Sequence, residues 1–141
     1  MTILTAASPH LTLPAANGFI VVVHADNPAT TIEREPLSNI FFKRVVKWPD
    51  GTTADPVDLT MKQPARLAFS ASVHKKSVGA VRAFWQQQIF SGREIPPAEI
   101  NNEADVIAYV IEHPGAVGYV SSSAHLTSGV KPLSVLGLVS P

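Results

Sequence analysis

Hydrophobic residues along the chain fall into short continuous runs that alternate with helical stripes. Residues 19–24 form a continuous run of aromatic and β-branched residues, the pattern expected of a strand covered on both faces. A short extended segment at 54–59, which carries two aspartates, and apolar segments at 116–120 and 133–139 predict three more strands. Between these segments apolar residues recur every three or four positions, which indicates amphipathic helices. Strands that alternate with helices predict an α/β sandwich.

The predicted helices have recognisable beginnings and ends. Small polar residues supply N-terminal caps for three of them, namely Thr30 or Thr31, Ser77, and Asn101 or Asn102. The stripe of the first helix extends to Val45, and a further helix is expected from Ala65 to about His74. Gly92 is expected to end its helix in a positive-φ conformation, and Gly115 to do the same at the helix-to-strand junction near the C-terminus. Residues 95–100 are expected to be a loop.

Length and charge limit the classes of function. The chain has 141 residues, which is typical of one domain, and its 45% apolar content is enough for a core. Its 11 basic and 11 acidic residues give a formal net charge of zero. A nucleic-acid-binding protein usually carries a basic stripe, so no nucleic-acid partner is expected. The chain contains no cysteine, which excludes disulfides and thiolate chemistry.

The N-terminal residues differ in composition from the rest. The first 23 residues contain no Lys or Arg, whereas a secretory signal needs a positively charged start. Residues 1–18 are therefore expected to be a flexible lead-in and not an intact signal peptide, and residues 19–141 to form the single folded domain. No apolar stretch approaches the roughly 20 residues of a membrane helix.

The sequence shows no recognisable catalytic or metal-binding arrangement. Asp55 and Asp58 lie three apart on a predicted strand, so they face opposite sides and are expected at turns or the sheet edge. The five histidines lack metal-ligand spacing, although His24, at the end of a buried strand, is either locally satisfied or near a ligand. Trp48 and Trp85 are expected in the core. We therefore expect a non-enzymatic protein without metal or cofactor.

The segment 60–66 is the best candidate for ligand binding. It leads into a predicted helix N-terminus, whose free amides and dipole favour an anion. Thr60 supplies a hydroxyl group, Gln63 an amide and Arg66 a positive charge. These three residues are the predicted contacts of a small anion, such as phosphate. The alternative is an ordinary helix start with solvated basic residues.

Three groups of residues in a fixed order also carry a family resemblance. They are the segment 35–41 with Trp48, the residues Phe69, Trp85, Phe90, Gly92 and Arg93, and the segment 114–120. In this order and spacing they resemble the substrate-binding protein of phosphate ABC transporters, and more broadly the type II periplasmic-binding-protein-like domain. The resemblance covers roughly residues 19–120. It implies a mixed sheet of about four or five strands flanked by about four helices, a periplasmic or otherwise extracytoplasmic location, and a membrane transporter or other protein as partner.

Two departures from the family pattern shape the functional expectation. Full-length members have two lobes around a ligand cleft, and this chain is about half as long, so the resemblance implies a single lobe. The family's Ser-Gly-Thr turn, often followed by Arg, corresponds here to residues 63–66, which lack both hydroxyl groups but keep Arg66. The resemblance therefore implies weak anion binding. The alternative is a protein-interaction or homodimerisation module that kept the fold and lost phosphate binding.

Overall fold

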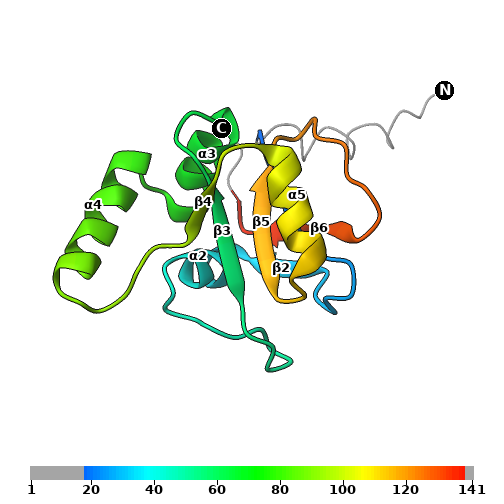
Figure 1. The fold of residues 1–141 in the computed structure, drawn as a ribbon, viewed down its shortest axis with the longest axis horizontal. Helices are drawn as coiled ribbons and strands as arrows, with labels where there is room; N and C mark the ends of the chain where they lie inside the picture. The colour runs from blue at the N-terminus through cyan, green and yellow to red at the C-terminus, as the bar shows by residue number, and fades with distance from the viewer. Residues whose placement is uncertain (1–17, 139–141) are drawn as a thin grey trace.

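A mixed sheet passes through the middle of the protein in a computed structural model that describes residues 18–138 (Figure 1). Its strands, in the order β2-β6-β1-β5-β3-β4 across the sheet, are β1 (Ile20–His24), β2 (Thr31–Glu33), β3 (Asp55–Leu59), β4 (Ala98–Ile100), β5 (Ala116–Val120) and β6 (Val130–Leu136). β1 is antiparallel to both β5 and β6, whereas β3 is parallel to β4 and β5, and β2 is parallel to β6. The predicted α/β class and mixed sheet are confirmed, with six strands instead of four or five. The expected lead-in, apart from Gly18, lies outside the described residues.

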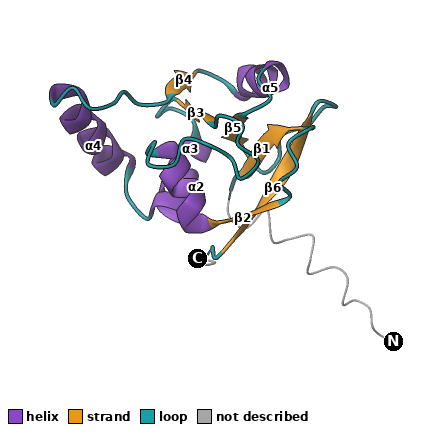
Figure 2. Ribbon diagram, turned by 90° about the horizontal axis from the view of Figure 1, so that it is seen from below, coloured by secondary structure: helices purple, strands orange, loops and turns teal. Residues whose placement is uncertain are grey.

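Helices cover both faces of the sheet. They are α2 (Arg34–Phe41), α3 (Pro64–Phe69) with its continuation as the π-helix η1 (Ser70–His74), α4 (Val78–Phe90) and α5 (Glu103–Glu112). Figure 2 shows α5 on one side of the sheet and α2 with α3 on the other. α4 stands away from the sheet, beyond β4, in both views. No helix within residues 18–138 combines the length and the apolar character that a bilayer crossing requires.

The core lies where α2, α3 and η1 meet the central strands. The Phe69 and Tyr119 rings stack with centroids 3.9 Å apart, and Phe41 packs against Phe69 at 4.8 Å. Trp48 and Trp85 are both buried, as predicted. Trp48 belongs to the main core, whereas Trp85 forms a second cluster with Phe42, Val81 and Phe84 that holds α4.

The predicted helix ends are partly confirmed. Ser77 caps α4 by accepting a hydrogen bond from the Ala80 amide, and Asn102 caps α5 in the same way. Gly92 follows α4 with a φ of 69°. The prediction for Gly115 is wrong, because this residue is not among those with positive φ. A Cβ at Gly115 would lie 1.9 Å from the Thr53 carbonyl oxygen, so close backbone approach excludes a side chain there.

Pairing between distant segments overturned other local expectations. Residues 31–33 pair with β6 as the short strand β2, so α2 begins at Arg34 and Thr30 and Thr31 do not cap it. α2 ends at Phe41, shortly before Lys43 with its φ of 59°, and the predicted stripe residue Val45 lies outside the helix and is partly exposed. Residues 98–100, expected in a loop, pair with β3 as β4. The last strand begins at Val130, three residues earlier than expected, and ends at Leu136, whereas residue 139 of the predicted range lies outside the described residues.

Candidate functional site

Arg66, the charged member of the predicted anion site, points into the protein. It lies in the first turn of α3, directly after the loop that leaves β3, and only 3% of its surface is exposed. Its Nη1 donates hydrogen bonds to the Leu59 carbonyl oxygen at 2.6 Å and to Glu99 Oε2 at 3.2 Å. Nη1 is therefore committed to partners on β3 and β4. Within residues 18–138, neither Nε nor Nη2 has a hydrogen-bond acceptor.

Asp58 is the buried counterpart of Arg66. Its Oδ1 accepts a hydrogen bond from the Tyr119 hydroxyl group at 2.6 Å and lies 4.0 Å from Arg66 Nε. Burial raises the pKa of Asp58, because removal from water penalises the charged carboxylate, while the positive charge of Arg66 opposes the rise. The expectation of a turn or sheet-edge position for Asp58 is wrong, since β3 pairs on both sides.

A cavity of about 210 Å³ lies beside this pair, between α4 and the β3–β4 side of the sheet. We call it the Arg66 cavity. It is lined by Asp58, Arg66, Arg82, Trp85, Gln86, Ile89, Pro96, Pro97 and Glu99. Arg82 contributes a second guanidinium group, whose hydrogen bond within the described chain goes to the Met61 sulfur, a weak acceptor. The cavity therefore combines two arginines with unfilled donors, two carboxylates and an apolar wall.

The other two predicted contacts do not line the Arg66 cavity. Gln63 Nε2 donates to the Asn101 carbonyl oxygen at 2.8 Å. The Gln63 amide in turn donates to the Thr60 carbonyl oxygen, and the Thr60 amide donates to Ile100, so backbone hydrogen bonds tie this loop to β4. The structure thus sends Gln63 and Arg66 to different partners, although they lie only three positions apart.

The start of α3 offers few free amides. α3 has six residues and begins with Pro64, which has no N–H group, and the Arg66 amide donates to the Gln63 carbonyl oxygen. The helix N-terminus therefore presents a weaker anion site than the sequence indicated. Any anion near Arg66 would depend on side-chain donors.

Where the structure shows a hydrogen-bond partner for a histidine, that partner lies within the protein, as the locally satisfied interpretation predicts. His24 Nδ1 accepts a hydrogen bond from the Asp26 amide at 3.0 Å. His74 is buried, and its Nδ1 lies 2.7 Å from the Ser38 hydroxyl oxygen. Within residues 18–138, no three histidine or acidic side chains come together in a way that could hold a metal ion.

Sequence reasoning missed the partners of Arg66, although one signal was present. Asp58 stands between Val57 and Leu59 in the predicted strand, and a carboxylate flanked by apolar residues in this way needs a buried partner. That signal could have indicated a buried cation. Nothing local identifies Glu99 and Tyr119 as the residues that complete the group, because they lie 41 and 61 positions away from Asp58.

Comparisons with known proteins agree with this architecture. A family model described as a PBP superfamily domain matches residues 7–138. The fold is similar to an ABC-type phosphate transport receptor from Vibrio cholerae, with a TM-score of 0.65 and 19% identity over 85% of this chain and 47% of that one. It is also similar to PstS from Borrelia burgdorferi, with a TM-score of 0.61 and 12% identity over 86% and 48%. The chain spans about half the length of these structures. No curated protein sequence matches it.

Proposed function

The chain belongs to the PBP superfamily, and from this membership we propose that it is a non-enzymatic solute-binding-like protein that binds a small anion weakly. The observation that supports this proposal is the buried Arg66 guanidinium group, which lines a cavity and has donors unfilled by the described chain. A similar structure is named as a phosphate transport receptor, so phosphate is the first anion to test. The protein would act outside the cytoplasm and deliver its ligand to a membrane transporter.

The charges around the Arg66 cavity explain why binding would be weak. Arg66 and Arg82 attract an anion, but Asp58 and Glu99 line the same cavity and repel it. The raised pKa of Asp58 reduces this repulsion, because Asp58 takes up a proton at a higher pH than an ordinary aspartate and then carries no charge. Thr60 and Gln63, on the neighbouring loop, remain predicted contacts of the anion. They can contact it only if the anion extends from the cavity to that loop.

Calorimetric titration with phosphate, sulfate and acetate tests the anion proposal. We expect millimolar affinity for at least one anion and a clear loss in Arg82→Gln, which removes one guanidinium group without leaving Asp58 unpaired. Lys47→Gln is the matched control, since it removes an exposed positive charge that lies outside both the cavity and the segment 60–66. Absence of binding to all three anions, or equal losses in both variants, would contradict the proposal.

The end of α4 favours a second candidate function, homodimerisation. Phe90 is 90% exposed, and Ile89 and Ile95, which lie within five positions of it in the chain, are more than half exposed. Exposed apolar groups gathered in this way are typical of contact surfaces. Arg93 and Glu94 in the same segment have opposite charges, so a two-fold-related copy would offer both the apolar contact and a complementary charge. The occupant that fits this surface is a second copy of the chain.

Sedimentation velocity over a wide concentration range tests the homodimer. We expect a concentration-dependent dimer that Phe90→Ser converts to a monomer. Leu136→Ser is the control, because Leu136 is exposed on β6, which lies near the edge of the sheet opposite β4. A wild-type chain that stays monomeric, or a dimer that survives Phe90→Ser, would exclude this surface.

A further inference from the structure

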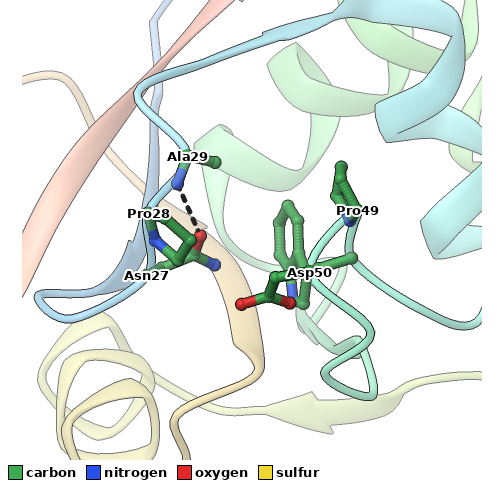
Figure 3. Close-up of a pocket in the computed structure, with 6 residues that line it drawn as sticks. Asn27, Pro28, Ala29, Pro49 and Asp50 are labelled. Carbon is green, nitrogen blue, oxygen red and sulfur yellow. Dashed lines mark hydrogen bonds between the residues drawn. The ribbon is translucent and has the colours of Figure 1, made fainter.

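A second cleft lies at the end of β1, away from the Arg66 cavity. The loop 25–29 faces the turn 48–50 across a cavity of about 390 Å³ (Figure 3). Its lining residues are Asn27, Pro28, Ala29, Trp48, Pro49 and Asp50. A smaller cavity of about 70 Å³ shares four of these residues and adds Asp26, Thr52 and Pro114. The two cavities therefore form one continuous cleft, which we call the Asn27–Asp50 cleft.

Asn27 presents an unpaired donor to this cleft. The residue is only 6% exposed, and its Oδ1 accepts a hydrogen bond from the Ala29 amide at 2.9 Å. This bond fixes the orientation of the side-chain amide, so Nδ2 points across the cleft towards Asp50 (Figure 3). Among residues 18–138 no acceptor is found for Nδ2. An amide N–H group that faces a cleft in this way can donate to a ligand carbonyl group in place of water.

Both sides of the cleft carry negative charge, from Asp50 in the turn 48–50 and from Asp26 in the loop 25–29. The Thr52 backbone N–H donates to the Asp50 carboxylate at 2.9 Å, and hydrogen bonds from Thr52 lower the pKa of Asp50. Asp50 is therefore anionic at neutral pH. Asp26 adds a second carboxylate, and no Lys or Arg is among the described residues that line either part of the cleft. The charge of the cleft favours a cation and disfavours phosphate.

The remaining walls are apolar and well fixed. Pro28, Ala29 and Pro49 line the larger cavity together with the Trp48 ring. Trp48 Nε1 donates to the Gly115 carbonyl oxygen at 2.9 Å, which holds the ring in position. An apolar side chain entering the cleft would therefore meet a preformed surface.

We propose that the Asn27–Asp50 cleft binds the amino-terminal residue of a peptide, or the amide of an apolar amino acid. The ligand's ammonium group pairs with Asp50 and Asp26, and its carbonyl oxygen accepts a hydrogen bond from Asn27 Nδ2. Its apolar side chain packs against the wall formed by the prolines and Trp48. An ammonium group next to a carbonyl group is what distinguishes this ligand from a simple amine. This site is separate from the Arg66 cavity and does not depend on anion binding.

Backbone amide NMR titration with phenylalaninamide tests the proposal directly. We expect saturable shifts confined to residues around 24–30 and 48–54, with a dissociation constant in the millimolar range. Two matched probes each remove one interaction, and a third adds a negative charge. N-acetylphenylalaninamide lacks the ammonium charge, phenethylamine lacks the carbonyl group, and phenylalanine carries a carboxylate that Asp26 and Asp50 repel. Each is expected to bind at least threefold more weakly, the size of effect that one exposed ion pair or one hydrogen bond produces.

Variants separate the charge from the fold. Asp50→Asn keeps a side-chain acceptor for the Thr52 amide but removes the charge, and it is expected to weaken phenylalaninamide at least threefold. Glu94→Gln removes an exposed carboxylate elsewhere and should have no effect. Absence of saturable shifts in the cleft, equal binding of the four probes, or an unchanged affinity in Asp50→Asn would overturn the proposal. Arg82→Gln should leave this binding unchanged, so failure here is distinct from failure of the anion proposal.

Discussion

The Tyr119 hydroxyl group donates a hydrogen bond to Asp58 at 2.6 Å across the middle of the sheet. The same oxygen accepts a hydrogen bond from the Leu59 amide at 3.2 Å, so one side chain satisfies two polar groups of β3. The strongly raised pKa of Tyr119, caused by burial and by the nearby Asp58, keeps this hydroxyl group protonated and able to donate. The pairing explains how β3 carries a carboxylate inside an apolar core.

Removal of the Tyr119 hydroxyl group should destabilise the protein. Tyr119→Phe leaves Asp58 and the Leu59 amide without this partner, and we expect a loss of about 2–3 kcal/mol in the free energy of unfolding. Tyr109→Phe is the control, because the Tyr109 hydroxyl group also bonds to an aspartate, Asp55, but in a less buried position. It should cost about 1 kcal/mol or less. Equal losses by urea denaturation would contradict this account.

Arg66 should matter more for stability than its neighbour Glu99. Arg66→Met leaves the buried Asp58 carboxylate without its cation, and loss of one partner of a buried ion pair costs about 3–5 kcal/mol. Glu99→Gln should cost under about 1 kcal/mol, because the Glu99 side chain is 47% exposed. Adding Asp58→Asn to Arg66→Met should recover part of the loss. No recovery in the double variant would show that Arg66 acts through packing alone.

Acidification should destabilise the fold through His74. Burial, with added repulsion from Arg66 and Arg34, lowers the pKa of His74 to about 4, whereas in the unfolded chain it is about 6.5. Between these values the unfolded state binds the proton that the folded state excludes, so the free energy of unfolding falls as the pH drops from about 6.5 to 4. The His74 contribution is about 3 kcal/mol at most.

Urea midpoints measured at intervals from pH 7.5 to pH 4 give the required comparison. The decline of the wild-type chain should be steeper than that of His74→Asn, which keeps a polar side chain but cannot titrate. Parallel declines in the two proteins would show that other groups cause the acid sensitivity.

Substitution by alanine should reduce stability to different extents at two glycines. Gly115→Ala places a Cβ 1.9 Å from the Thr53 carbonyl oxygen, so the backbone must move, and we expect a loss of about 3 kcal/mol or more. Gly92→Ala meets open space but must adopt a positive φ, at a cost of about 1–2 kcal/mol. Thermal unfolding of both variants checks this order, and a larger loss of stability for Gly92→Ala than for Gly115→Ala would contradict it.

The sequence by itself determined the elements whose signals are local. Apolar runs identified β1 and β5, and β3 was recognised as a short extended segment. The caps Ser77 and Asn102 were recognisable because each bonds to an amide three residues later. The burial of both tryptophans also followed from their positions in apolar segments. Such features depend on residues close in the chain, so periodicity and capping chemistry are enough to predict them.

Only the tertiary structure decided the features that depend on distant partners. The short strands β2 and β4 exist because β6 and β3 lie beside them, and Gly115 is required because Thr53 approaches its backbone. Arg66 was expected to face an outside anion, yet the fold places Glu99 and Asp58 next to it. A buried charge takes the partners that folding brings within reach, and no local pattern records which residues those will be.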